Sequence, residues 1–433
     1  MQRKNATRRE FLSRMAAAGT VGGLGACATS ATRKAPARVN PVALSTGTSK
    51  RHTLGANERI QCGFIGIGNR GTSLLETVLG RADVDVIAVA DIYDTALAKA
   101  AGQCRSKYSQ VRSYVRFEDL LEKEKLDAVV IATPDHIHAP AILGALDCGY
   151  DVYTEKPMTL TWQDAQQVRD RAPAAGAVVQ VGTQLRSMPM YQKAREAYQS
   201  GAIGRLVAVQ VERHSGRGRT RPVPEDLNES HVQWDLFLRD TKPYPFDPNR
   251  FLNWRRYLEY SNGAAGDLML HHLDIFHFIT GCGMPERVMS VGGVYFYEDG
   301  RTCPDTIGVL LEYPERFQFN FTTTYVNGHY GLMERYLGSE GTIEIREMSE
   351  MSIYRSAGPG EKGDGDQEEI VPSAGVFNEP HLDDFFRCMR TREQTIAPVD
   401  AGCIGATCCH MAVLSEQTGE SAKWDAATNQ VAL

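Results

Sequence analysis

The sequence predicts an α/β protein whose first folded domain binds a dinucleotide. An apolar segment at residues 60–65 runs into the motif G-x-G-x-x-G, a helical segment follows, and a second apolar segment at 84–90 ends at Asp91. Further apolar segments, at 126–133, 151–154 and 177–181, alternate with helical ones. This alternation is typical of a parallel sheet with helices on both faces. We therefore place a Rossmann domain at residues 59–183.

The glycine motif predicts how the dinucleotide is held. It consists of Gly66, Ile67, Gly68, Asn69, Arg70 and Gly71. Gly66 suits a tight turn, Gly68 lets backbone N–H groups approach a pyrophosphate, and Gly71 allows close packing of helix on strand. Asp91 follows at about the 20-residue distance of a carboxylate that accepts hydrogen bonds from the adenosine ribose. Because a carboxylate there repels a 2′-phosphate, we expect NAD rather than NADP, although Arg70 in the turn keeps NADP open.

The first residues predict export. Residues 7–12, T-R-R-E-F-L, form a twin-arginine pattern, and the apolar run at 15–26 is shorter than the about 20 residues that span a bilayer. The run ends in L-G-A-C, which resembles the lipobox of bacterial lipoproteins, so Cys27 is either a lipid anchor or a plain thiol. We assign residues 1–27 to a signal peptide and 28–58 to a flexible linker. The expected location is the periplasm or the exported side of the membrane, and the export machinery is an expected partner.

The composition and charge indicate which kinds of partner to expect. A net charge of −6 with 42% hydrophobic residues is ordinary for a globular protein and gives no reason to expect nucleic acid or an anionic membrane as partner. The ten cysteines lack C-x-x-C spacing, so we expect no essential disulfide. Nicotinamide dinucleotides are cytoplasmic metabolites, so a protein exported in the folded state leaves with its cofactor already bound. The cofactor is therefore expected not to dissociate.

Three further motifs point to one family. They are T-P-D-H-I-H-A-P at residues 133–140, E-K-P at 155–157 and G-A-A-G-D-L-M-L-H-H-L-D at 263–274. With the glycine motif, they resemble the Gfo/Idh/MocA oxidoreductases over about residues 59–425. The resemblance implies a C-terminal α/β domain, residues 184–433, with a large open, mixed and mainly antiparallel sheet, and a homo-oligomer. Strand-like runs at 206–213, 287–296, 306–313, 317–325 and 341–346, and helix-like runs at 381–390 and 402–418, agree with it.

The third motif predicts a catalytic base. If residues 267–274 are helical, Asp267, His271 and Asp274 share one face, while His272 turns toward the apolar side. An imidazole held by carboxylates suits removal of a hydroxyl proton, so we expect His271 to be the general base, Asp267 to orient it and Asp274 to assist. The resemblance implies that Lys156 lies beside the nicotinamide and hydrogen-bonds the reacting oxygen. Glu155 is expected to orient Lys156, and Pro157 to follow a cis peptide.

Other residues complete the expected site. Because ligands lie at the carboxyl ends of parallel strands, the expected cofactor contacts outside the glycine motif are Thr133, Pro134, His138, Glu155 and Lys156. The candidate substrate contacts are Arg186, Trp254, Arg255, His272 and Tyr325, although packing is the favoured role of His272. Residues 134–140 are expected to form a loop after the strand at 126–133. Histidines one residue apart, as His136 and His138 are, invite a metal, but on an extended segment their side chains point in opposite directions. Asp267, His271 and Asp274 could also ligate a metal, but no cysteine or second histidine at matching spacing supports it, so we expect none.

These observations predict an NAD-dependent oxidoreductase that exchanges hydride with a hydroxyl-bearing carbon of a sugar, polyol or glycoside. One alternative is a redox-neutral glycoside hydrolase that oxidises, eliminates, hydrates and reduces with the same bound NAD. The other is a non-catalytic sugar-binding protein, for which loss of Lys156 or His271 would be the signature. Both residues are present.

Overall fold

The computed structural model describes residues 55, 58–108, 110–355, 367–373, 375 and 378–433. The predicted signal peptide with Cys27, nearly all of the predicted linker and the segment 356–366 lie outside these residues. In the part described, no helix is both long and apolar enough to cross a membrane.

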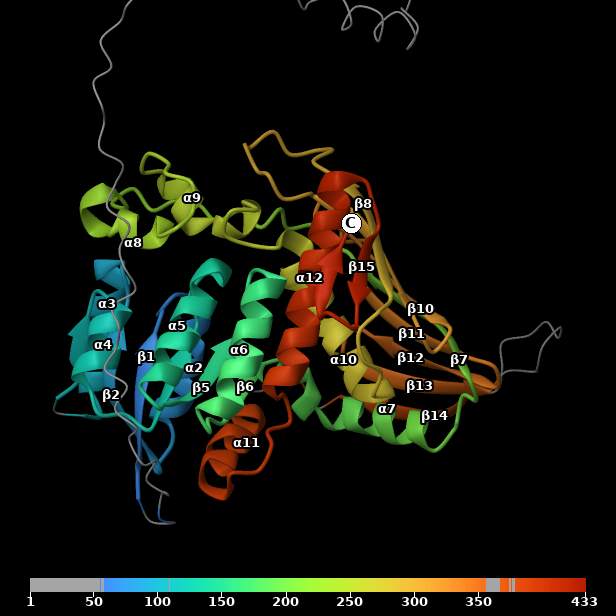
Figure 1. The fold of residues 1–433 in the computed structure, drawn as a ribbon, viewed down its shortest axis with the longest axis horizontal. Coiled ribbons are helices and arrows are strands. Elements are labelled where there is room, and N and C mark those ends of the chain that lie inside the picture. The colour runs from blue at the N-terminus through green and yellow to red at the C-terminus, as the bar shows by residue number, and fades with distance from the viewer. Residues whose placement is uncertain (1–54, 56–57, 109, 356–366, 374, 376–377) are drawn as a thin grey trace, which may run out of the picture. The chain divides into compact units, whose positions relative to one another are not determined.

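The first domain is a six-stranded sheet with the strand order β3-β2-β1-β4-β5-β6, and all neighbours are parallel (Figure 1). Its strands are β1 (Ile60–Ile65), β2 (Val84–Ala90), β3 (Arg112–Tyr114), β4 (Ala128–Ile131), β5 (Asp151–Glu155) and β6 (Val179–Gly182). Its helices are α2 (Asn69–Leu79), α3 (Asp94–Arg105), α4 (Phe117–Lys123), α5 (Asp135–Asp147) and α6 (Trp162–Ala174). The predicted Rossmann fold is confirmed.

The start of α5 differs from the prediction. Residues 135–140 were expected to form a loop after β4, but they are the first turns of α5, with Pro134 at the N-cap position. Proline suits this position because it needs no backbone hydrogen bond there. His136 and His138 therefore lie on a helix rather than on an extended segment.

The second domain holds a ten-stranded sheet with the order β14-β13-β12-β11-β7-β10-β9-β8-β15-β16. Only the β7–β10 pair is parallel in the described sheet, so the expected mixed, mainly antiparallel sheet is confirmed. The strands are β7 (Leu206–Arg213), β8 (Arg287–Gly293), β9 (Thr306–Tyr313), β10 (Phe317–Thr324), β11 (Leu332–Gly338), β12 (Gly341–Arg346), β13 (Glu350–Arg355), β14 (Gln367–Pro372), β15 (Ala422–Asp425) and β16 (Gln430–Ala432).

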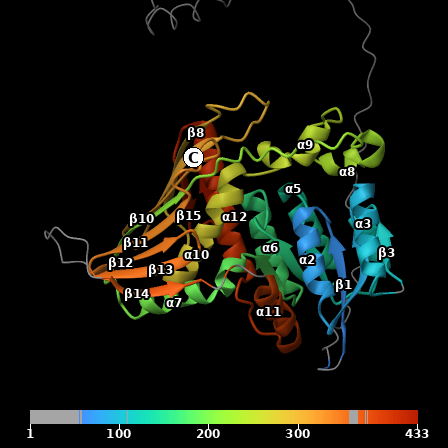
Figure 2. The ribbon, with the colours of Figure 1, turned by 180° about the vertical axis from the view of Figure 1, so that it is seen from behind.

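Helices cover one face of this sheet and connect it to the first domain. They are α7 (Pro189–Gln199), α10 (Leu270–Thr280) and α12 (Val399–Thr418) (Figure 2). Their apolar side chains pack on the inward residues of the strands. The α12 helix contacts α6 of the first domain and β8 of the second, so it packs between the two domains. The helix α11 (Asn378–Thr391) packs on the α2 side of the first sheet. The second domain is therefore packed against the Rossmann domain through α11 and α12.

A buried ion pair fastens the start of the second domain. Arg186, in the short helix η1 (Gln184–Ser187), donates to both carboxylate oxygens of Asp274 at 2.7 and 2.8 Å, and the two side chains are 8% and 3% exposed. Both residues were predicted to serve the active site, Arg186 as a substrate contact and Asp274 beside His271. These two predictions are wrong, since each side chain satisfies the other.

Replacing Arg186 by Gln should lower the free energy of unfolding by about 3–5 kcal/mol, because Asp274 would keep a buried charge without its partner. Chemical denaturation at neutral pH measures this. The control is Glu196→Gln, which removes the exposed Lys193–Glu196 pair on α7 and should change stability by less than about 0.5 kcal/mol. Equal effects of the two substitutions would contradict the assignment.

Candidate active site

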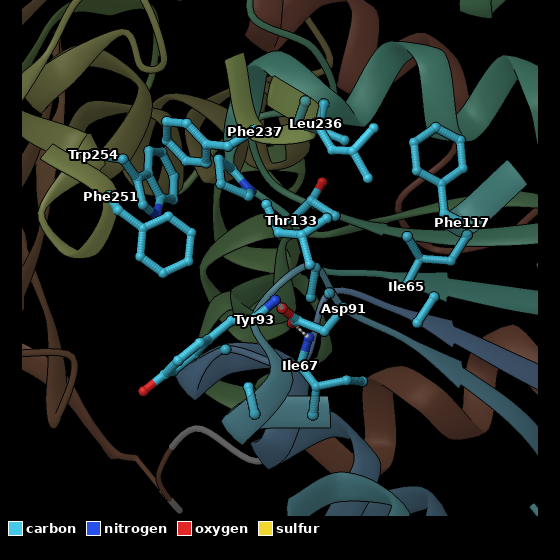
Figure 3. A pocket seen from close by; sticks show the side chains of 18 of the residues that line it. Ile65, Ile67, Asp91, Tyr93, Phe117, Thr133, Leu236, Phe237, Phe251 and Trp254 are labelled. Carbon is cyan, nitrogen blue, oxygen red and sulfur yellow. Dashed lines mark hydrogen bonds between the residues drawn. The ribbon is translucent and has the colours of Figure 1, made fainter. Parts of the chain in front are cut away.

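A cavity of about 410 Å³ lies at the carboxyl edge of the Rossmann sheet (Figure 3). The glycine turn forms its floor. Gly66 has φ +83°, and a Cβ there would lie 2.8 Å from the Thr133 nitrogen, whereas a Cβ at Gly71 would lie 2.0 Å from the Gly66 oxygen. Gly68 faces open space. Side chains are thus excluded at Gly66 and Gly71, while backbone is exposed to the cavity at Gly68, as a bound pyrophosphate requires.

Asp91 lies at the edge of this cavity. Its carboxylate accepts hydrogen bonds from the backbone nitrogens of Ile67 at 2.6 Å and Tyr93 at 2.8 Å. Burial raises the pKa of Asp91, and these two hydrogen bonds oppose the shift. The carboxylate is therefore held in place next to the glycine turn. The residues present fit a dinucleotide here, and Thr133 and Pro134 line the same cavity as predicted.

Glu155 does not orient Lys156. Its carboxylate accepts hydrogen bonds from Arg70 Nε at 2.7 Å and Gln184 Nε2 at 3.0 Å. Glu155 and Lys156 are consecutive at the end of β5, so their side chains point to opposite sides, and only the Lys156 backbone nitrogen reaches the carboxylate, at 3.3 Å. Glu155 instead holds the arginine of the glycine turn. The Lys156–Pro157 peptide is cis, as predicted.

His138 is not among the residues that line the cavity. It is fully buried, with Nδ1 2.6 Å from the Pro157 oxygen and Nε2 2.9 Å from the Thr133 oxygen. Its neighbour His136 lies 2.7 Å from the Phe237 oxygen. The predicted cofactor contact at His138 is wrong because α5 starts early and turns the ring inward. His138 instead ties the turn after β4 to the turn after β5.

Lys156 connects the two domains. Its ammonium donates to the backbone oxygens of Asp267 at 2.8 Å and Gly266 at 3.3 Å, and lies 3.5 Å from Asp267 Oδ1. Both side chains are 10% exposed. Burial lowers the pKa of Lys156, and the Asp267 charge opposes this. A lysine near the end of β5 is thus fixed against the segment that carries Asp267.

Two arginines join the same carboxylate. Arg219 Nη2 lies 2.9 Å from Asp267 Oδ2, and Arg255 Nε lies 3.5 Å from Oδ1. Burial alone would raise the pKa of Asp267, but Lys156, Arg255 and Arg219 bring it well below its usual range. Arg255 also lines the cofactor cavity, beside Trp254. The cluster around Asp267 therefore adjoins the dinucleotide site.

His271 lies near this cluster without the predicted carboxylate bonds. Its Nδ1 is buried and has no hydrogen-bond partner among the described residues. Residues Ala265–Met269 form a π-helical turn before α10, and the i→i+5 bonding changes the rotation between Asp267 and His271. Neither predicted carboxylate holds His271, because Asp267 is engaged by Lys156 and two arginines and Asp274 by Arg186. Burial, and then the charges of Lys156 and Arg213, lower the pKa of His271 well below its ordinary value.

His272 packs away from the cavity. It is fully buried, donates from Nδ1 to Glu334 at 2.9 Å and accepts at Nε2 from Arg213 at 2.8 Å. The favoured packing role is confirmed, and the candidate substrate contact at this residue is wrong. Tyr325 is also buried, with Arg219 5.9 Å above its ring.

Asp135 is a site residue that the sequence did not reveal. It begins α5, is 5% exposed, and burial raises its pKa to about 7, against the opposing charges of Arg255 and Lys156. The acid in T-P-D was the available signal, but it was expected to lie in a loop. Among the described residues no group of three or more His, Cys, Asp or Glu could hold a metal, and the nine cysteines there are free thiols.

Asp135→Asn should change how stability depends on pH. Between pH 3.8 and about 7, Asp135 is protonated in the folded protein but ionised in the unfolded chain. The free energy of unfolding therefore falls as pH rises through that range, and this contribution is constant above it. The variant lacks this fall and should be more stable at alkaline pH by up to about 4 kcal/mol. Denaturation of both proteins across this range measures the difference. A stability difference that does not vary with pH, or one shared by the exposed control Asp170→Asn, would contradict it.

Comparison with known proteins identifies the family. The model described as "Oxidoreductase family, NAD-binding Rossmann fold" matches residues 60–183, and the Gfo/Idh/MocA C-terminal domain matches residues 191–344. The chain belongs to the Gfo/Idh/MocA oxidoreductase family. Both halves of the cluster lie within these matches, since Lys156 falls in the first and Asp267 in the second.

Individual relatives are distant. The putative oxidoreductase YteT of Bacillus subtilis is 27% identical over 216 residues, which is 46% of this chain and less than half, 44%, of that protein. Myo-inositol 2-dehydrogenase of Thermotoga maritima is 23% identical over 70% of this chain and 80% of its own length. A levoglucosan dehydrogenase solved with NADH and levoglucosan shares the fold, with a TM-score of 0.66, 18% identity, and coverage of 84% of this chain and 99% of that one.

Proposed function

We propose that this protein is an NAD-dependent dehydrogenase that acts on a CH–OH group of a sugar, polyol or glycoside. The observation that carries the proposal is Lys156, which is held against Asp267 at the carboxyl edge of the Rossmann sheet and is close enough to His271 to lower its pKa, next to a cavity with a dinucleotide-binding glycine turn. Relatives named as dehydrogenases of inositol and levoglucosan support a polyhydroxylated substrate.

The side chains divide the chemistry. When bound, NAD supplies the nicotinamide that accepts hydride. Lys156 donates a hydrogen bond to the reacting oxygen, and Asp267 with the neighbouring carbonyls fixes the ammonium. His271, neutral because of its lowered pKa, takes the hydroxyl proton. Arg255 lines the cavity and also reaches Asp267, and Trp254 lines the cavity beside it; both are proposed to contact the substrate.

Asp91 supports NAD over NADP. Its carboxylate is fixed at the cavity edge, where it would repel a 2′-phosphate. Arg70, which could have received that phosphate, is engaged by Glu155 at 2.7 Å and by Asn378 at 2.8 Å. The cation of the glycine turn is therefore already compensated.

A cover over the cavity supports a cofactor that does not dissociate. The segment from α8 (Trp234–Leu238) to α9 (Pro248–Leu252) supplies Leu236, Phe237 and Phe251 to the cavity wall (Figure 3). This segment is fastened to the Rossmann domain, because Gln233 N donates to the Ile92 oxygen at 3.0 Å and Arg239 pairs with Glu118 at 2.7 Å. Retention agrees with the proposed twin-arginine export to the periplasm, with or without a lipid at Cys27.

The outer face of the second sheet supports the expected homo-oligomer. It exposes Val207, Met289 and Val291, of which Val291 is 77% exposed. Apolar side chains on an open sheet favour association with another chain.

Turnover without added cofactor tests the function. Protein purified without NAD is incubated with a panel of sugars and glycosides while the absorbance of reduced nicotinamide is recorded. A keto-sugar with reduced bound cofactor is expected. Free aglycone without net reduction would indicate the hydrolase, binding without either reaction would indicate a sugar-binding protein, and absence of a dinucleotide after denaturation would contradict retention.

His271→Ala should lower kcat on the best substrate by roughly 10²–10⁴-fold, the usual effect of losing a general base. In the unaltered enzyme, kcat/KM should show no decrease centred at pH 6.5, the ordinary pKa of histidine, as the pH is lowered. The reason is that the pKa of His271 lies well below that value. Steady-state rates against pH measure both effects. The exposed His329 offers a control as His329→Asn, and a loss within about threefold in His271→Ala would refute the assignment.

A further inference from the structure

The cluster around Asp267 holds more positive than negative charge. Lys156, Arg219 and Arg255 all lie within 3.5 Å of this one carboxylate. Of the other carboxyls near Lys156, Glu155 pairs with Arg70, and Asp135 has a pKa of about 7 and is largely neutral below that pH. Lys156 is only 10% exposed, whereas Arg219 and Arg255 are 39% and 33% exposed and remain open to solvent. Three cations around one carboxylate create a region of positive potential, so the cluster is suited to receive an anion.

Arg213 adds a fourth cation, and buried residues position it. It ends β7 and donates from Nη1 to His272 Nε2. Glu334 accepts hydrogen bonds from His272 Nδ1 at 2.9 Å and from the Tyr191 hydroxyl at 2.6 Å, so the ring is neutral and its tautomer is fixed. Arg213 is thus bonded to a neutral ring and remains charged, with Asp267 and Glu334 as the nearby negative groups. It is close enough to Asp267 and His271 to influence the pKa of both.

Arg219 is held by a fixed segment. Its φ is +55°, a conformation that persists only where the surroundings impose it. On one side, Arg301 donates to the Gly218 oxygen at 2.9 Å. On the other, Asn253 binds both backbone groups of Arg221, at 2.7 and 3.1 Å. Arg301 and Asn253 are buried. The Arg219 guanidinium is therefore preorganised between Tyr325 and Asp267.

The cofactor phosphates do not account for these two arginines. Arg221 and Arg255 line the dinucleotide cavity, but Arg213 and Arg219 do not. Arg219 instead pairs with Asp267, and Arg213 is close enough to Asp267 and His271 to shift the pKa of both, on the side where the reacting hydroxyl is proposed to bind. An anion held by Arg213 and Arg219 would consequently belong to the substrate.

Resting on the proposed dehydrogenase function, we propose that the substrate is a sugar bearing an anionic group, such as the carboxylate of a uronate or aldonate, a sulfate or a phosphate. Arg213 and Arg219 bind this group while Lys156 and His271 act on a hydroxyl of the same molecule. The planar guanidinium matches the paired oxygens of such groups.

Binding to the cofactor-loaded protein tests the proposal. Titration calorimetry compares galacturonate with its uncharged methyl ester and with galactose, glucuronate with glucose, and glucose 6-phosphate as the phosphate arm. The charged member should bind on the order of 10- to 100-fold more tightly than its neutral counterpart, which is the effect of one or two charge-assisted hydrogen bonds. Arg219→Gln, exposed enough to fold normally, should reduce this preference about tenfold or more, whereas Arg217→Gln, exposed on the same segment, should preserve it.

The outcomes separate the two proposals. If neutral sugars bind as tightly as charged ones and reduce the cofactor, the anionic substrate is refuted and the dehydrogenase stands. If charged sugars are preferred but never reduce the cofactor, the anionic ligand stands and the dehydrogenase fails. If the preference survives Arg219→Gln, the assignment of Arg219 is overturned. If no sugar binds, both proposals fail.

Discussion

The Lys156 ammonium and the backbone of the π-helical turn form the contact on which the active site depends. Lys156 follows the last strand residue of β5, while Gly266 and Asp267 belong to the second domain. A π-helical turn shifts the regular bonding pattern, and here the oxygens of Gly266 and Asp267 point at the ammonium. One side chain thereby sets the position of the dinucleotide edge relative to the proton-handling residues.

Around this contact, most charged side chains form ion pairs that differ in their structural roles. Arg186 with Asp274 is structural, Arg70 with Glu155 secures the glycine turn, and both pairs have near-balanced charge. The cluster at Asp267 is different because several cations share one carboxylate. Balanced pairs maintain the framework, and the imbalance is confined to the place where a ligand is expected.

Much of the fold could be predicted from the sequence because local patterns matched the final structure. The glycine motif, the apolar parallel strands and β7, β9 and β12 follow such patterns. The strand β11 was not predicted, since its inward positions include the charged Glu334 between Leu332 and Tyr336. The buried Glu334 carboxylate is stabilised by hydrogen bonds from His272 and Tyr191, which are distant in the sequence. The site was predictable where a motif contains the residue, as for Lys156. It was not predictable where a residue distant in the sequence decides, as Arg186 does for Asp274, or where a loop supplies the side chain, as for Arg219.

The glycine turn is also supported by α11, a helix that is distant from it in the sequence. Asn378, the first residue of α11, accepts a hydrogen bond from Arg70 and donates to Ser73 at 3.0 Å, both in α2. The turn and this side-chain support are 308 residues apart in the sequence. During synthesis the Rossmann strands therefore lack the support until Asn378 has been translated, long after β6 is complete.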